Sequence, residues 1–202
     1  MHIFSPPSPD DLIRLLKAWK FWVLGAILGA VIGAAVYYVS PPSYRARATV
    51  LVDFNLEQAL PDDTDRQHFY YLERETRKLE EIARSDAVIG GVASGSDDTV
   101  EALRGGVLQL GQPAEGGWHF YADDPDAERA SRLASAWAQG FVELARQKII
   151  SGELNPFIQL EVTQSADLPV VRSEPISTYL LIGALAFSAV SAFLVLFLGR
   201  KP

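Results

Sequence analysis

Residues 21–39 read FWVLGAILGAVIGAAVYYV, a run of 19 residues without a charged side chain. A helix of this length rises about 28 Å, which is close to the ~30 Å hydrocarbon thickness of a bilayer. Trp19 and Trp22 lie at one end of the run and Tyr37 and Tyr38 at the other, as expected for an aromatic belt at each interface. The stretch therefore predicts a transmembrane helix, which two prolines at positions 41 and 42 end.

A second apolar run, ISTYLLIGALAFSAVSAFLVLFL, covers residues 176–198 and is also long enough to span a membrane. The tail at 1–20 carries three basic residues against two acidic ones, and the tail at 199–202 carries two basic residues and no acid. Because basic residues near span ends stay in the cytoplasm, both tails are expected there. The region 40–175 is then expected outside the cytoplasmic (inner) membrane, in the periplasm or at the cell exterior.

The composition excludes several classes of function. The region between the spans holds 13 basic and 23 acidic residues, a balance of −10, which disfavours nucleic acid as a partner. The sequence has no cysteine, and its three histidines are not spaced as metal ligands. It also lacks GxxxxGK[ST], GxSxG and HExxH patterns. We therefore expect no enzyme, no catalytic residue, no metal and no cofactor.

Small residues recur at four-residue spacing in both apolar runs. The first run has Gly25, Gly29 and Gly33, and the second has Ala184, Ser188 and Ala192. Such stripes let two membrane helices approach closely, so a helix-packing role is predicted for these six residues. The stripe by itself leaves open whether the partner helix belongs to the same chain or to another copy.

Residues 40–175 mix the two secondary-structure periods, which predicts an α+β domain inserted between the spans. The first and last strands each lead to a membrane helix, so the simplest sheet pairs these two strands. The alternation predicts strands at 44–53, 107–110, 117–122 and 157–164, and helices at 66–83, 87–93, 99–103 and 126–150.

Particular side chains in this domain carry further expectations. In the charged helix, a thin apolar stripe of Phe69, Leu72, Leu79 and Ile82 should face the core. Adjacent acids at 62–63 and 123–124 should cap the helices that follow them. Trp118 and Phe120 share one strand face, which favours a core position over glycan binding by the aromatic segment 118–121.

The order of parts resembles the Wzz-type chain-length determinant proteins, the polysaccharide co-polymerases. The resemblance begins with a basic tail, a first span and the segment PPSYRARATV at 41–50. A strand, Asp-Pro and an alanine-rich helix follow at 120–138. A proline-containing segment with Ala166, Pro169 and Pro175 leads into the second span, with Arg172 where the family usually has a third proline. The stretch between 150 and 157 is too short for the family's long projecting helices, so a short member made of the base domain is expected.

The resemblance implies a non-enzymatic membrane scaffold that assembles as a homo-oligomer. It also implies action on the membrane polymerase or export machinery of a surface polysaccharide, such as lipopolysaccharide, capsule or exopolysaccharide, and control of its chain length. The alternative is a transmembrane adaptor that activates a separate cytoplasmic tyrosine kinase. Residues 10–20, DDLIRLLKAWK, are the docking element for that alternative, while the four residues 199–202 argue against it.

Overall fold

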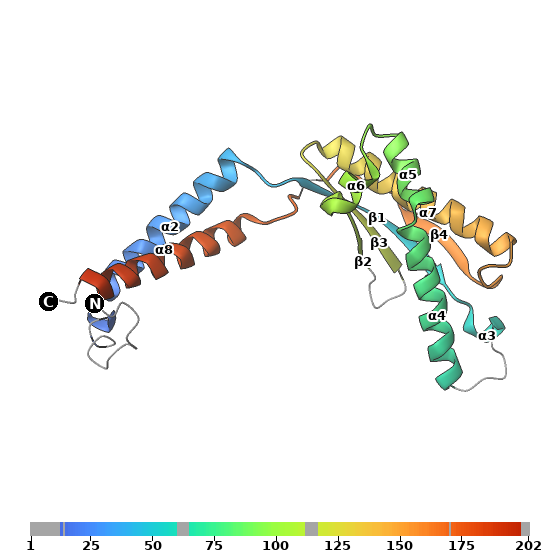
Figure 1. The fold of residues 1–202 in the computed structure, drawn as a ribbon, viewed down its shortest axis with the longest axis horizontal. Coiled ribbons are helices and arrows are strands. Elements are labelled where there is room, and N and C mark those ends of the chain that lie inside the picture. Colours follow the sequence, from blue (N-terminus) through green and yellow to red (C-terminus); the bar gives the residue numbers. More distant parts are fainter. Residues whose placement is uncertain (1–12, 14, 60–64, 112–116, 170, 199–202) are drawn as a thin grey trace. The chain divides into compact units, whose positions relative to one another are not determined.

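A computed structural model describes residues 13, 15–59, 65–111, 117–169 and 171–198. The expected helix start at 61–64, the turn at 112–116 and both tail ends lie outside the described residues. The chain divides into two compact units, residues 1–42 with 174–202 and residues 43–173. The elements of these two units are shown in Figure 1.

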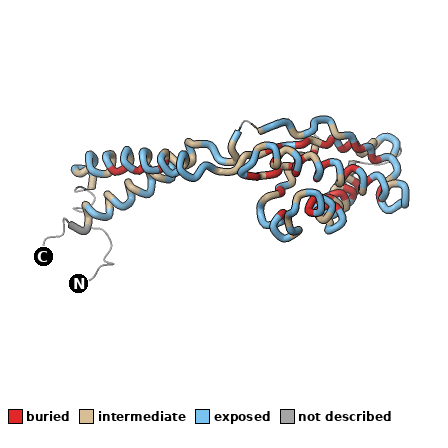
Figure 2. Tube along the Cα trace, turned by 90° about the horizontal axis from the view of Figure 1, so that it is seen from above, coloured by how far each residue is buried: buried red, intermediate tan, exposed pale blue. Residues whose placement is uncertain are grey.

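The first unit is a pair of helices, α2 (Trp19–Val39) and α8 (Ile176–Leu198), that pack on each other. Both helices are long and apolar enough to cross a membrane. Apart from the glycines of α2, few of their described side chains are buried, as Figure 2 shows by colour. An apolar surface that remains exposed around such a pair is suited to contact with lipid.

The second unit contains a four-stranded antiparallel sheet with strand order β2-β3-β1-β4. The expected pairing of the first and last strands is confirmed, with Leu51 opposite Glu161 and Asp53 opposite Gln159. The order β-α-β-β-α-β along the chain, with this strand order, is the split β-α-β arrangement. Its elements are β1 (Tyr44–Asp53), α3 (Leu56–Ala59), α4 (Asp65–Ala83), α5 (Asp86–Ser94), α6 (Val100–Ala102), the π-helical turn η1 (Leu103–Val107), β2 (Leu108–Gly111), β3 (Gly117–Asp124), α7 (Ala127–Ile150) and β4 (Gln159–Gln164).

The core lies between the sheet and the long helix α7, which packs along β1, β3 and β4. Trp118 and Phe120 are buried in it, as alternation along β3 predicted. Phe120 meets Trp137 edge-on at 4.9 Å between ring centroids, and Trp118 stacks on Phe141 at 5.4 Å. These large aromatic contacts fix α7 on one face of the sheet.

Short polar residues begin the helices, as their sequence positions indicated. The Asp126 side chain accepts hydrogen bonds from the backbone N–H groups of Glu128 and Arg129 and so caps α7. Asp124 in turn accepts from the N–H of Asp126 at 2.8 Å. The capping role expected for Asp123 is wrong, because its carboxylate instead binds Arg45 across the strands at 2.6 and 2.8 Å.

Helix α4 buries only part of the predicted stripe. Leu79 is buried and Ile82 packs partly buried against the core, whereas Phe69 is 62% exposed. Tyr71 and Glu75, which the prediction did not include, are also buried. The stripe was read from apolar residues alone, and this helix places a tyrosine and a charged glutamate on its inner side. Two i,i+4 ion pairs lie on its outer side, Glu73 with Arg77 and Glu80 with Arg84.

Candidate functional site

The glycine stripe of α2 forms the contact with α8. Gly25, Gly29 and Gly33 are the buried residues of α2. A Cβ on Gly25 would collide with the Ser191 side chain, and one on Gly29 would collide with the backbone of Gly183. The glycines are thus required for close approach of two helices within one chain.

On α8, the stripe Ala184, Ser188 and Ala192 is half-buried beside the closest contact line. Ser188 lies near the α2 backbone, where its hydroxyl donates to the carbonyl of Trp22 at 3.4 Å. The residues directly against the glycines are Tyr179, Gly183, Phe187 and Ser191. Gly183 is the only glycine inside this span. It was the signal in the sequence that could have identified which face of α8 packs against the glycines of α2.

The segment after β4 is fastened to the domain at two places. At the first, the carbonyl of Ala166 accepts from the Ser131 hydroxyl at 2.6 Å, and its N–H donates to Ser135 at 3.1 Å. Both serines lie on α7. At the second, the N–H of Ser173 donates to the carbonyl of Ser43 at 2.8 Å.

This second place joins the segment to the start of β1. Tyr44 and Arg172 form an antiparallel bridge, and the Arg45 N–H donates to the carbonyl of Val171. The guanidinium of Arg172 lies 3.6 Å from the centroid of the Tyr44 ring and also donates to its hydroxyl at 2.9 Å. We call residues 43–45 with 171–173 the strand clasp. Through it, the chain enters and leaves the domain at neighbouring positions.

Of the predicted proline segment, Ala166 is therefore a fastening point. Pro169 is half-buried in the stretch between the two fastenings, and Pro175 is exposed just before α8. The clasp partners Tyr44 and Arg172 lie 128 residues apart in sequence, so no local pattern pointed to their contact.

The face of the sheet opposite α7 carries exposed or half-buried side chains, and no described helix packs on it (Figure 1). We call it the open sheet face. Its members on the three strands β1, β2 and β3 are Arg45, Arg47, Thr49, Leu51, Asp53, Gln109, Gly111, Gly117, His119, Tyr121 and Asp123.

A polar network orders one part of this face. Arg45 makes its bidentate pair with Asp123 and also donates to the Gln109 side-chain carbonyl at 3.2 Å. Its guanidinium lies 5.7 Å from the ring centroid of Tyr121. Bidentate charge-assisted hydrogen bonds hold both partners in a defined geometry. The guanidinium beside the Tyr121 ring is therefore held in a fixed position.

His119 borders Tyr121 on the other side, with ring centroids 5.8 Å apart. Burial, and secondarily the nearby charge of Arg47, lowers the pKa of His119 below its ordinary value. The imidazole is therefore neutral at pH 7, and its Nδ1 lies 3.1 Å from the Thr49 hydroxyl. This part of the face consequently carries aromatic rings and hydrogen-bonding groups without added histidine charge.

A cavity of about 650 Å³ lies between α4, α7 and the loop after α7. Ile82, Leu144 and Leu154 line it, with Lys78 and Lys148 beside them. Lys78 donates to Glu75 at 3.0 Å and to the carbonyl of Glu153 at 3.2 Å, so it ties α4 to that loop. Both lysines are thus already engaged with acidic residues or carbonyls of the domain.

Helix α4 also buries polar groups. Glu75 is 1% exposed, and one of its oxygens, like the hydroxyl of Tyr71, has no hydrogen-bond partner among the residues that the structure describes. Burial, followed by the charge of Glu75, raises the pKa of Tyr71.

Within the described ranges no group of three potential metal ligands lies together. No protein-family model and no curated protein matches the chain.

Proposed function

We propose that this chain is a non-enzymatic membrane scaffold that assembles as a homo-oligomer and regulates the chain length or export of a surface polysaccharide. In this proposal α2 and α8 span the inner membrane, both tails are cytoplasmic, and the α+β domain lies outside. The order of motifs that resembles the chain-length determinant family supports it. The partner is then a membrane polysaccharide polymerase or export complex.

The observation that carries the proposal is the strand clasp together with the glycine contact of α2 and α8. The clasp holds the entering and leaving segments side by side, and the glycines bring the two helices together within the chain. In this proposal the domain, held at both of its ends, acts on its partner through its shape, and no reactive group is needed. The glycine stripe of α2 already packs against α8 of the same chain, so assembly of several copies has to use other surfaces.

The first experiment compares the size distribution of surface polysaccharide on gels from a strain lacking the protein and from the same strain after restoration. We expect a shift in modal length that restoration reverses. An unchanged distribution would overturn the chain-length role. In parallel, the detergent-purified chain should have the mass of a homo-oligomer, and a monomer in several detergents would contradict the scaffold proposal.

A double replacement of Pro169 and Pro175 by alanine tests the role of shape. Proline fixes the backbone angle φ, so this variant loosens the segment that leads into α8. We expect normal expression with impaired control of polymer length. Pro156→Ala, in the loop before β4, is the matched control and should behave like the unaltered chain. Unaltered length control in the double variant would refute the role of this segment.

One observation keeps the kinase adaptor as a second candidate. Ile13 and Leu16 are exposed in the helical residues that precede α2, and the Trp22 indole donates to the carbonyl of Leu15 at 3.2 Å. An exposed apolar face of this kind suits either the membrane interface or a docking partner. Capture of a tyrosine kinase by residues 1–20, lost on Leu16→Asp, would favour the adaptor.

A further inference from the structure

A row of three side chains crosses the middle of the open sheet face. The β-pairing places Gln109 of β2 and Arg47 of β1 on either side of Tyr121 of β3. A Cβ on Gly111 would lie 3.0 Å from the Tyr121 ring, so the ring extends over this glycine. The absence of a side chain at Gly111 therefore lets an aromatic surface spread across the edge of the sheet.

The charge around this row differs from that of the rest of the domain. Arg45 is neutralised by Asp123, whereas Arg47 is exposed and makes no hydrogen bond or ion pair in the described part of the chain. Acids exceed bases by ten between the spans. No ion pair joins any acid of the described ranges to Arg47. Arg47 is thus an available guanidinium, a group that recognises carboxylates with two parallel hydrogen bonds.

The surrounding residues favour a small polar ligand over a macromolecular partner. Leu51 is the only aliphatic side chain on the open sheet face as defined above, which is too little for the apolar centre of a protein interface. A nucleic acid is disfavoured by the acidic domain. An acidic sugar combines a C–H face for the aromatic rings, hydroxyls for Thr49 and Gln109, and a carboxylate for Arg47.

We propose that the open sheet face binds carboxylate-bearing sugar units of a glycan, with the sugar ring against Tyr121 and its carboxylate on Arg47. The inference rests on the proposed function, because it names the polymer class that the scaffold would contact. Contact with the polymer outside the membrane gives the scaffold a direct means of sensing the growing chain.

The test titrates the full chain in detergent micelles with tetragalacturonate, maltotetraose and a tetraglutamate peptide by calorimetry. We expect tetragalacturonate to bind more tightly than the neutral sugar or the acidic peptide. Arg47→Gln should weaken it about tenfold or more, since a hydrogen bond to a charged group is lost. Tyr121→Ala should weaken it about tenfold, while Tyr121→Phe, which keeps the ring, should bind like the unaltered chain.

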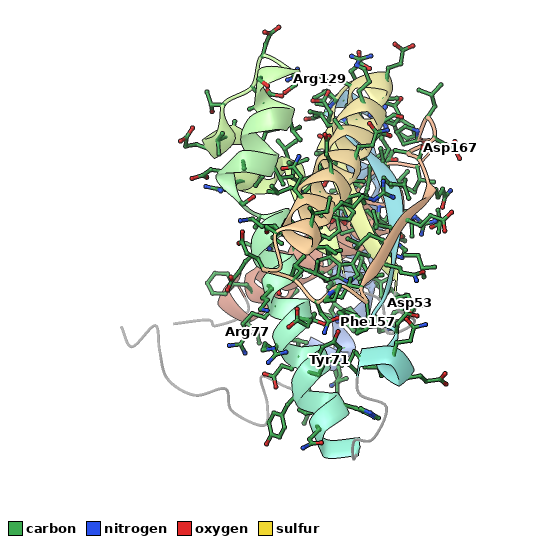
Figure 3. The ribbon with its side chains drawn as sticks, turned by 90° about the vertical axis from the view of Figure 1, so that its right-hand side faces the viewer. Asp53, Tyr71, Arg77, Arg129, Phe157 and Asp167 are labelled. Carbon is green, nitrogen blue, oxygen red and sulfur yellow. The ribbon has the colours of Figure 1, made fainter. Side chains whose placement is uncertain are left out.

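Arg77→Gln is the control, because Arg77 is another exposed arginine and projects from α4, away from the open sheet face (Figure 3). It should leave binding unchanged. Equal melting temperatures of the variants would show that the domain stays folded. Failure of the unaltered chain to bind tetragalacturonate would overturn the site, and so would equal binding of tetraglutamate or full binding by both Arg47→Gln and Tyr121→Ala.

The gel assay of polymer length separates this inference from the function on which it rests. A reversible length shift in the deletion strain, without binding of tetragalacturonate, would overturn the sugar site and leave the scaffold standing. Binding that depends on Arg47, with no length shift, would overturn the scaffold function and leave the site standing.

Discussion

Replacement of Gly29 by leucine should force α2 and α8 apart. A Cβ at this position would lie 2.7 Å from the Gly183 carbonyl carbon and from the Phe187 Cβ. Carbon atoms in contact lie about 3.5 Å apart or more, so these two contacts alone require a separation of roughly 0.8 Å. The Gly183 carbonyl oxygen lies closer still, so the helices have to move apart by more than this. The obstacle on the Gly183 side is backbone, which cannot rotate away as a side chain can.

Overpacking of a close contact costs about 1–3 kcal/mol, which corresponds to roughly a 5- to 150-fold loss of the packed helix pair. The chain lacks cysteine, so an introduced pair reports on this contact without background. Tyr37 and Tyr179 are suited to it, because their ring centroids lie 5.4 Å apart across the two helices. Cross-linking of cysteines at these positions should be fast in the parent chain and much slower with Gly29→Leu.

Ala35→Leu provides the control, because Ala35 is exposed on α2 and the same bulk would there point away from α8. It should leave the cross-linking rate unchanged. If Gly29→Leu cross-linked as fast as this control, the close approach of α2 and α8 through the glycines would be refuted.

Three further predictions concern the folded domain. Trp137→Phe removes an indole N–H that donates to a buried backbone carbonyl at 2.8 Å, so chemical unfolding should show a loss of about 1–3 kcal/mol. The hydrogen bond from Arg129 lowers the pKa of Asp98, so the folded state binds a proton on this carboxylate less readily than the unfolded state. The stability contributed by Asp98 is therefore full above the unfolded pKa of the carboxyl, near 4, and is lost as the pH falls below it. Over the same pH range, the difference in unfolding free energy between the parent chain and Asp98→Asn, measured in urea, should shrink. Gly106 has φ of +130°, so Gly106→Ala should lower the melting temperature although its Cβ meets open space, whereas Gly105→Ala, in equally open space without positive φ, should not.

Local patterns in the sequence were sufficient for most of the elements, but not for the short helix α3 or the π-helical turn η1. Charge-free runs gave the two apolar helices, and alternation gave the strands and the burial of Trp118 and Phe120. Short polar residues such as Asp126 marked helix starts. Each of these features depends on a period or a cap within a few residues, which the chain specifies before any long-range contact forms.

Errors and omissions arose where distant segments meet. Asp123 was expected to cap a helix, but β1–β3 register places it opposite Arg45, 78 residues away. Part of the inner face of α4 was missed for a different reason. The apolar stripe left out Tyr71 and the charged Glu75, which is buried while paired with its neighbours Arg74 and Lys78.

Two apolar helices, an α+β domain between them, and the face that each strand presents could be predicted from local sequence patterns. Three contacts depend on the packing of the whole chain: Gly183 meets Gly29, Tyr44 and Arg172 close the strand clasp, and Tyr121 spreads over Gly111 beside the exposed Arg47. The reason is physical. Secondary structure follows from short-range periodicity, whereas the side chains that form a surface are selected by strand register and helix packing between residues far apart in the chain.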